Sequence, residues 1–217
     1  MIEGQFIVLE GIDGSGTTTH SDILSDRLAA KGLPVHVTRE PSDGPVGVLI
    51  RQILTGRVVV PGHRGTHAPS WTTMATLFAA DRLDHLEAEI VPNLLDGVSI
   101  VCDRYDYSSV AYQTVSSGGG PDAARWVREL NRRARRPDLT LVLDVTPEVA
   151  ASRRSSRSGS PELYETDSMQ VALAAFYSTI GDLFPDDRIR HIDANRDIEG
   201  VADAIWAEVA ALRGETP

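Results

Sequence analysis

The chain has a single cysteine, Cys102, and no long apolar run. One cysteine excludes an internal disulfide bond and a metal site built from several cysteines. No apolar stretch approaches the length of about 18 residues that a transmembrane helix needs, and the first residues lack the basic segment and cleavage site of a signal peptide. We therefore expect a cytoplasmic protein without a membrane partner.

Positive charge is also scarce. Lys and Arg total 21 against 31 Asp and Glu, which gives a formal net charge of -10. A protein that binds duplex nucleic acid is usually basic, so this balance disfavours nucleic acid as a partner. An acidic protein can still bind a small anion where a few of its arginines converge.

Length and composition are those of an ordinary globular protein: the chain has 217 residues, of which 41% are hydrophobic and 24% are charged. This length predicts one domain, residues 1–217, with a full hydrophobic core.

Short apolar runs alternate with helical patterns along the chain. The runs predict strands over residues 5–10, 33–38, 98–103, 139–145 and 188–192. Helices are predicted over residues 18–31, 46–54, 72–95, 108–115, 121–135 and 198–212. Because the strands are apolar throughout, we expect an α/β fold: a three-layer, doubly wound parallel sheet of five strands with helices on both faces. Residues 56–70 look like a surface excursion, and the Ser- and Arg-rich residues 155–161 like part of a lid.

Residues 11–18 read GIDGSGTT, directly after a predicted strand and before a predicted helix. This is the phosphate-loop pattern G-x-x-x-x-G-K-[ST], in which backbone N–H groups and the N-terminus of the next helix bind phosphates. The lysine position, however, holds Thr17. We expect the loop to bind ATP through these residues: Gly11, Ile12, Asp13, Gly14, Ser15, Gly16, Thr17 and Thr18.

The missing lysine leaves two other interpretations open. The segment can be a glycine-rich turn without a ligand, or a loop that binds a nucleotide without catalysing a reaction. A catalytic loop without its lysine needs positive charge from elsewhere in the chain.

Several further motifs follow in order: TREP at 38–41, FAADR at 78–82, DRY at 103–105, AYQ at 111–113 and LDVTPE at 143–148. Each motif alone also has a structural interpretation. Arg39 can pair with Glu40 at the surface, and Phe78 can lie in the core with Arg82 paired to Asp81. Phe78 and Arg82 are four residues apart, so they share one helix face.

Together with the phosphate loop, this ordered set resembles the thymidylate kinase family over nearly the whole chain. The resemblance implies an enzyme that transfers a phosphoryl group from ATP to dTMP, uses Mg²⁺ and forms a homodimer. It also implies a P-loop NTPase-like fold with a short lid at about residues 153–165. Two alternatives stay open: a kinase for another small nucleoside monophosphate, and a nucleotide-binding protein that is inactive because Thr17 replaces the lysine.

The resemblance also assigns roles to individual residues. It implies dTMP binding by Arg39, Phe78, Arg82, Arg104, Ser109, Tyr112, Gln113 and Glu165. It implies catalytic roles for Asp13, Arg104, Arg153 and Arg157. It places Mg²⁺ at Thr18 and Asp103, directly or through water. We further expect Arg153 or Arg157 to supply the charge that Thr17 lacks.

Overall fold

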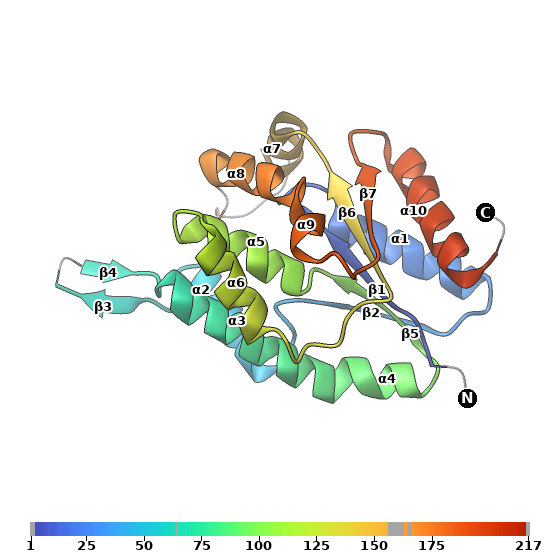
Figure 1. The fold of residues 1–217 in the computed structure, drawn as a ribbon, viewed down its shortest axis with the longest axis horizontal. Helices are drawn as coiled ribbons and strands as arrows, with labels where there is room; N and C mark the ends of the chain where they lie inside the picture. Colours follow the sequence, from blue (N-terminus) through green and yellow to red (C-terminus); the bar gives the residue numbers. More distant parts are fainter. Residues whose placement is uncertain (1–2, 64, 156–162, 165, 216–217) are drawn as a thin grey trace.

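Five parallel strands form the centre of the molecule, between layers of helices (Figure 1). The computed structural model describes residues 3–63, 65–155, 163–164 and 166–215. Across the sheet, the strands follow the order β2 (Val35–Arg39), β5 (Ser99–Asp103), β1 (Phe6–Glu10), β6 (Leu139–Asp144) and β7 (Ile189–Asp193). All neighbouring pairs are parallel, which confirms the predicted fold class.

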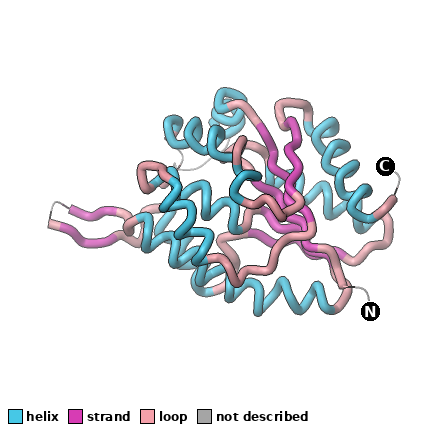
Figure 2. The backbone as a smooth tube through the Cα atoms, viewed as in Figure 1, coloured by secondary structure: helices cyan, strands magenta, loops and turns pink. Residues whose placement is uncertain are grey.

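The helices lie on both sides of these strands (Figure 2). Their bounds are α1 Thr17–Ala30, α2 Pro45–Leu54, α3 Trp71–His85, the π-helical turn η1 Leu86–Ile90, α4 Val91–Leu95, α5 Asp106–Ser116, α6 Pro121–Leu130, α7 Pro147–Ser155, α8 Asp167–Tyr177, α9 Ile180–Leu183 and α10 Ile198–Arg213. No helix within the described ranges has both the length and the apolar composition needed to cross a membrane.

The central strand β1 shows why the apolar runs form this sheet. Successive side chains of a strand point to opposite faces. Phe6 and Val8 belong to a buried cluster with Ile90 of η1, whereas Ile7 and Leu9 belong to a second cluster with Leu24 of α1. Both faces are therefore covered, and every residue of β1 is buried. The inner strands β1 and β5 are buried throughout, whereas the edge strand β2 is only half-buried.

Three predicted segments differ from the structure. The helix expected over 72–95 is interrupted by the π-helical turn, and the helix expected over 121–135 ends at Leu130. The expected excursion 56–70 contains a hairpin of β3 (Val60–Gly62) and β4 (Gly65–His67) that projects from the body (Figure 1). Strand β3 contains Pro61, and a proline is tolerated in an edge strand such as β3.

Candidate active site

The phosphate loop joins the end of β1 to the start of α1, as predicted. Three of its glycines have positive φ: 154° at Gly11, 93° at Gly14 and 99° at Gly16. A Cβ at Gly14 would also lie 2.5 Å from the carbonyl oxygen of Ala150, so only glycine lets α7 approach the loop this closely. Gly16 caps α1 without a side-chain hydrogen bond, which leaves the first N–H groups of the helix for an anion.

Thr18 and Asp103 form a pair beside this loop. The hydroxyl of Thr18 donates to Oδ2 of Asp103 over 2.5 Å. The other carboxylate oxygen of Asp103, Oδ1, is buried and has no hydrogen-bond partner among the described residues. Mg²⁺ binds hard oxygen ligands, usually one or two carboxylates together with waters and substrate phosphates. The donor set at this strand end fits that ion.

Asp13 connects the loop to a second part of the site. Its Oδ1 accepts hydrogen bonds from Arg104, over 2.8 Å, and from the hydroxyl of Tyr112, over 2.9 Å. Its Oδ2 accepts from Nε2 of Gln170 over 2.7 Å. Arg104 also donates to the carbonyl oxygen of Gly11. Arg104 has a φ of 70°, which is unusual for a residue other than glycine and is typical of strained functional positions.

A buried carboxylate, Glu10, supports the backbone turn around Arg104. Oε1 of Glu10 accepts from the backbone N–H groups of Tyr105, at 2.8 Å, and Ser108, at 3.1 Å. Its Oε2 accepts from the hydroxyls of Ser108 and Tyr177. Burial raises the pKa of Glu10 to about 7, although Arg104 and these hydrogen bonds oppose the shift. Sequence reasoning missed Glu10, which ends an apolar strand without belonging to a motif.

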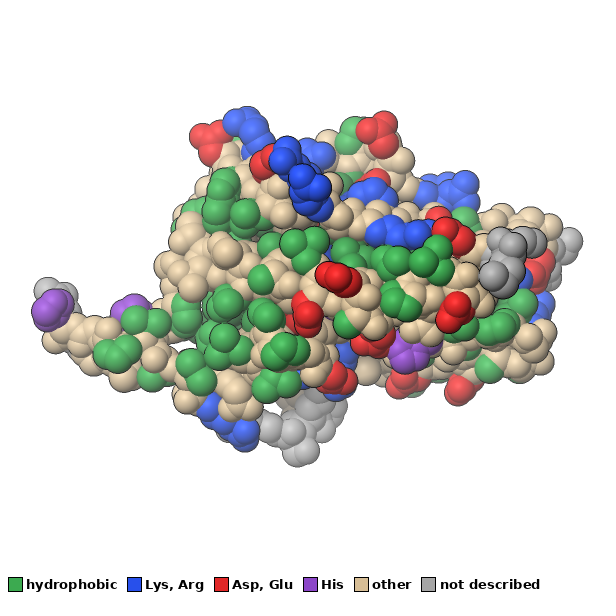
Figure 3. Space-filling model, turned by 90° about the horizontal axis from the view of Figure 1, so that it is seen from below, with side chains coloured by type: hydrophobic (Ala, Val, Ile, Leu, Met, Phe, Trp, Pro, Cys, Tyr) green, Lys and Arg blue, Asp and Glu red, His purple; other side chains and the backbone are tan. Residues whose placement is uncertain are grey.

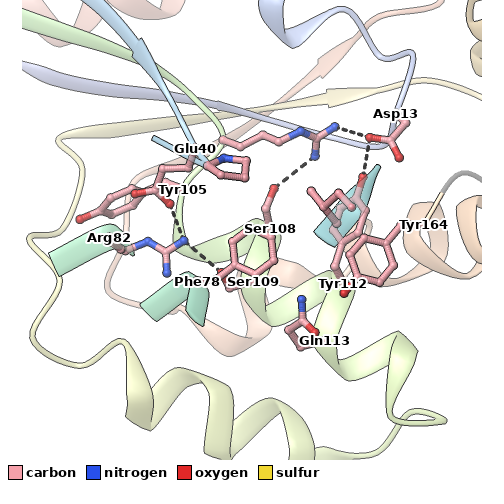
Figure 4. Close-up of a pocket in the computed structure, with 13 residues that line it drawn as sticks. Asp13, Glu40, Phe78, Arg82, Tyr105, Ser108, Ser109, Tyr112, Gln113 and Tyr164 are labelled. Atoms are coloured by element: carbon pink, nitrogen blue, oxygen red, sulfur yellow. Dashed lines mark hydrogen bonds and ion pairs between the residues drawn. The ribbon is translucent and has the colours of Figure 1, made fainter. Parts of the chain in front are cut away.

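A cavity of about 140 Å³ opens beside Asp13 and Arg104 (Figure 4). It brings together six of the residues predicted to contact dTMP: Phe78, Arg82, Arg104, Ser109, Tyr112 and Gln113. Gln113 is fully buried, and neither atom of its amide has a hydrogen-bond partner among the described residues. Tyr164, which sequence reasoning did not assign, packs edge-on against Tyr112 with ring centroids 5.5 Å apart.

Arg82 lines this cavity and is buried. It donates to Glu40 and to Asn131 over 2.5 Å each, and to the hydroxyl of Ser109 over 3.0 Å. The alternative pairing with Asp81 is therefore wrong, since Asp81 accepts instead from Ser42. Glu40 and Asn131 lie far from Arg82 in sequence, and only the fold reveals their contact with it.

Arg39 does not line the cavity. Its side chain is exposed and lies 3.2 Å from Asp43, and this hydrogen bond holds the pKa of Asp43 below its usual value. The alternative partner suggested by the sequence, Glu40, binds Arg82 instead.

The arginines predicted to enter the lid are distributed differently. Arg153 donates to the carbonyl oxygen of Ala194 over 2.9 Å and lines a second cavity with Gly16 and His20. Arg154 donates to the carbonyl oxygen of Asp13 over 2.7 Å. Arg157 and Glu165 lie outside the described residues. Arg154, which the sequence groups with Arg153 and Arg157 at the predicted lid, is thus in direct contact with the phosphate loop.

The parallel sheet, the glycine-rich loop at the end of its central strand and the strand-end Asp103 define a phosphotransferase of the P-loop class. The model of the family described as thymidylate kinase matches residues 9–205. The chain belongs to the thymidylate kinase family.

Three similar proteins illustrate how far the likeness extends. The probable thymidylate kinase of Pyrococcus horikoshii is 38% identical over 208 residues, covering 96% of this chain and 97% of that protein. The thymidylate kinase of Thermomicrobium roseum is 38% identical and covers 95% of both chains. That of Alkalilimnicola ehrlichii is 35% identical, covering 97% of this chain and 94% of the relative.

Proposed function

We propose that this chain transfers the terminal phosphoryl group of ATP to the phosphate of dTMP, forming ADP and dTDP. The observation that carries this proposal is the position of Asp13. Asp13 belongs to the phosphate loop and also lines the cavity that contains Phe78 and Arg82, and its carboxylate accepts from Arg104 over 2.8 Å. The donor and acceptor sites therefore adjoin, as direct transfer between two bound substrates requires.

The acceptor cavity has the chemistry of a thymine site. Thymine presents one N–H donor between two carbonyl acceptors. Arg82 offers N–H donors, the Gln113 amide offers both a donor and an acceptor, and the Phe78 ring offers a stacking surface. All three residues line the same cavity. Tyr112, held by Asp13, then lies beside the deoxyribose.

The chain also contributes to phosphoryl transfer by positioning the two substrates and by neutralising the negative charge of their phosphates. Arg104, fixed by Asp13 and Gly11, is placed to bind the acceptor phosphate, and its guanidinium can also approach the transferring group. Thr18 and Asp103 would hold Mg²⁺, which neutralises charge on the donor phosphates when bound. Gly16, His20 and Arg153 line a neighbouring cavity suited to the rest of the donor nucleotide. No activated nucleophile on the protein is required.

A coupled assay of ADP release tests this function. The assay is run with dTMP, dUMP, CMP, AMP and no acceptor. We expect dTMP to give the highest kcat/KM and the assay without acceptor to give little ADP. A higher value for another monophosphate would reassign the acceptor, and no stimulation by any of them would identify a nucleotide-binding protein without kinase activity.

We also infer that two copies of the chain associate. Hydrophobic side chains gather on the face seen in Figure 3, near the base of the β3–β4 hairpin. Large exposed hydrophobic residues on α2 and α3 include Val48, Leu49 and Leu83. Helices α2 and α3 pack together, and α3 carries Phe78 and Arg82, so such an interface would lie next to the acceptor cavity.

A further inference from the structure

Arg82 and Glu40 form a buried ion pair that lines the acceptor cavity (Figure 4). Their side chains are 1% and 2% exposed, and Nη2 of Arg82 donates to Oε2 of Glu40. A guanidinium and a carboxylate frequently pair through two parallel hydrogen bonds. Here only one oxygen of Glu40 binds Arg82, and the other oxygen, Oε1, is directed to a different residue.

That residue is His85. Its Nδ1 lies 3.4 Å from Oε1 of Glu40, and the side chain of His85 is also buried. An ionised carboxylate only accepts hydrogen bonds, so Nδ1 carries the hydrogen of this contact. The other ring nitrogen, Nε2, lies 2.7 Å from the hydroxyl of Thr38 and 3.5 Å from Glu89. Contacts at both ring nitrogens therefore fix the orientation of the imidazole.

Three elements hold these groups together. His85 ends α3 and lies three residues after Arg82, so the two side chains share one face of the helix. Strand β2 supplies Thr38, and Glu40 follows directly after this strand. The π-helical turn η1 starts after His85 and carries Glu89. His85 cannot turn away from Glu40 without breaking the contacts of its ring with β2 and η1.

Arg82 retains N–H groups that no protein group uses. Its Nη1 donates to Asn131, and its Nη2 donates to Glu40 and Ser109. A guanidinium has five N–H donors, so two remain. One of them is on Nε, which is buried and has no hydrogen-bond partner among the described residues. If Oε1 of Glu40 also turned to Arg82, the second bond of the pair would take up one of these two donors.

The remaining donors of Arg82 bear on the choice of base. Thymine has an accepting oxygen at position 4, whereas cytosine has a donating amino group there. Arg82 only donates, so it suits thymine and opposes cytosine. The Gln113 amide has both a donor and an acceptor, and neither has a partner among the described residues, so the amide can turn to suit either base. Discrimination between the two bases therefore depends on Arg82.

We propose that His85 is a positioning residue for base selection. It holds Oε1 of Glu40 away from Arg82 and thereby leaves an N–H group of Arg82 for the oxygen at position 4 of thymine. His85 does not itself line the cavity, so it acts through Glu40 and Arg82. This inference rests on the proposed kinase function and extends it to the choice between thymine and cytosine monophosphates.

Two substitutions separate the hydrogen bonds of His85 from its bulk. His85→Leu removes both ring nitrogens, whereas His85→Gln keeps an N–H donor for Glu40. We expect His85→Leu to raise KM for dTMP and to lower the ratio of kcat/KM for dTMP over dCMP at least about tenfold, the size of one hydrogen bond to a charged group. KM for ATP should stay within about twofold, because the donor site is untouched. His85→Gln should keep at least about a third of the unmodified ratio.

His36→Leu is the matched control. His36 is partly exposed and binds Glu89 over 2.6 Å rather than Glu40. Its variant should keep the ratio of kcat/KM for dTMP over dCMP within about twofold. If His85→Leu does not fold, Thr38→Val carries the test, because it removes only the hydroxyl beside Nε2 of His85. Thr38→Val should lower the ratio about threefold, the size of a weak neutral hydrogen bond.

Melting temperatures show which variants are folded, and calorimetric titration with dTMP and dCMP repeats the comparison without phosphoryl transfer. The inference is overturned if folded His85→Leu keeps the ratio within about twofold of the unmodified value, or if His85→Gln is no better than His85→Leu. It is also overturned if His36→Leu lowers the ratio as much as His85→Leu, or if Thr38→Val leaves the ratio unchanged where it carries the test. An unmodified chain that does not phosphorylate dTMP would instead overturn the proposed function.

Discussion

At the scale of single residues, Glu10 links the stability of the fold to pH. It is fully buried, and burial raises its pKa from 4.5 to about 7. Its neighbours are Arg104, Ser108 and Tyr177, which come from the turn after β5, from α5 and from α8. Between these two pKa values the native protein keeps a proton on Glu10 that the unfolded chain has already lost. The contribution of Glu10 to stability is therefore complete below pH 4.5 and is lost as pH rises through about 7.

We expect Glu10→Gln to remove this pH dependence. The amide is neutral at every pH, keeps an oxygen for the N–H groups of Tyr105 and Ser108, and can donate to the two hydroxyls. The free energy of unfolding of the unmodified protein should fall by about 3 kcal/mol between pH 4.5 and 8 relative to the variant, at about 1.4 kcal/mol per pKa unit. Urea denaturation of both proteins across this range measures the difference. If the free energy of unfolding depends on pH in the same way for both proteins, Glu10 does not titrate in this range.

Phe78 tests the assignment of the acceptor cavity. It lines the cavity and lies four residues before Arg82 on the same face of α3. Phe78→Ala should weaken dTMP binding by about 1–3 kcal/mol, the range measured for stacking of a base on an aromatic ring. Leu77→Ala is the control: Leu77 is partly buried and packs against the same small cluster as Phe78 but does not line the cavity, so its loss should lower stability without changing dTMP affinity. Calorimetric titration with dTMP and with ATP separates the two effects, and unchanged dTMP affinity in Phe78→Ala would place Phe78 outside the site.

The sequence indicated some site residues better than others, for physical reasons. Thr18 and Asp103 follow from local patterns, because a phosphate loop and an apolar strand end each specify their own geometry. Glu40 and Asn131 could not be predicted, since they reach Arg82 across 42 and 49 residues of chain. The sequence grouped Arg153 and Arg154 in the lid without distinguishing their contacts, because periodicity alone does not say which of two adjacent arginines faces the phosphate loop.

At the scale of elements, the contact between α7 and the phosphate loop is the most specific packing feature. The sequence predicted the strand, the loop and α1 from periodicity, but it gave no sign that Ala150 would lie against Gly14. The same limit applies to α6, which ends at Leu130 rather than near residue 135. Asn131, which follows the last residue of α6, donates to the Val127 carbonyl and accepts from Arg82, so tertiary contacts determine this helix end.

Gly14→Ala should separate α7 from the loop. The new Cβ would lie 2.5 Å from the Ala150 carbonyl oxygen, and φ of 93° already disfavours a side chain. Gly32→Ala is the matched control, because φ is 75° there and no atom lies within 4 Å of the new Cβ. We expect the control to cost about 1–2 kcal/mol of stability from backbone strain alone, with ATP binding retained. We expect Gly14→Ala to bind ATP at least about tenfold more weakly than Gly32→Ala. Equal ATP affinities of the two variants would show that the contact between α7 and the loop is not needed for ATP binding.

At the scale of the whole molecule, the acceptor cavity lies between the phosphate loop and helices α2 and α3. Asp13 lines it from the loop, and Leu54 and Phe78 line it from the two helices. The parallel sheet was predictable because continuous apolar runs require cover on both faces. The hairpin β3–β4 was not, because its residues are exposed and no burial pattern marks them. Packing within one chain does not explain why this hairpin projects or why the apolar side chains beside it are exposed.

A second copy of the chain would cover that apolar surface. Val48 and Leu49 of α2 and Leu83 of α3 are 45%, 40% and 44% exposed, and burying such side chains drives association. We expect the unmodified protein to sediment as a dimer and the pair of substitutions Leu49→Glu and Leu83→Glu to sediment as a monomer, because each places a charge in the interface. Val171→Glu is the control: Val171 is 54% exposed on α8, which lies above α5 in Figure 1 whereas α2 and α3 lie below it, and its variant should remain a dimer. A monomeric unmodified protein, or dissociation of all variants alike, would contradict an interface at α2 and α3.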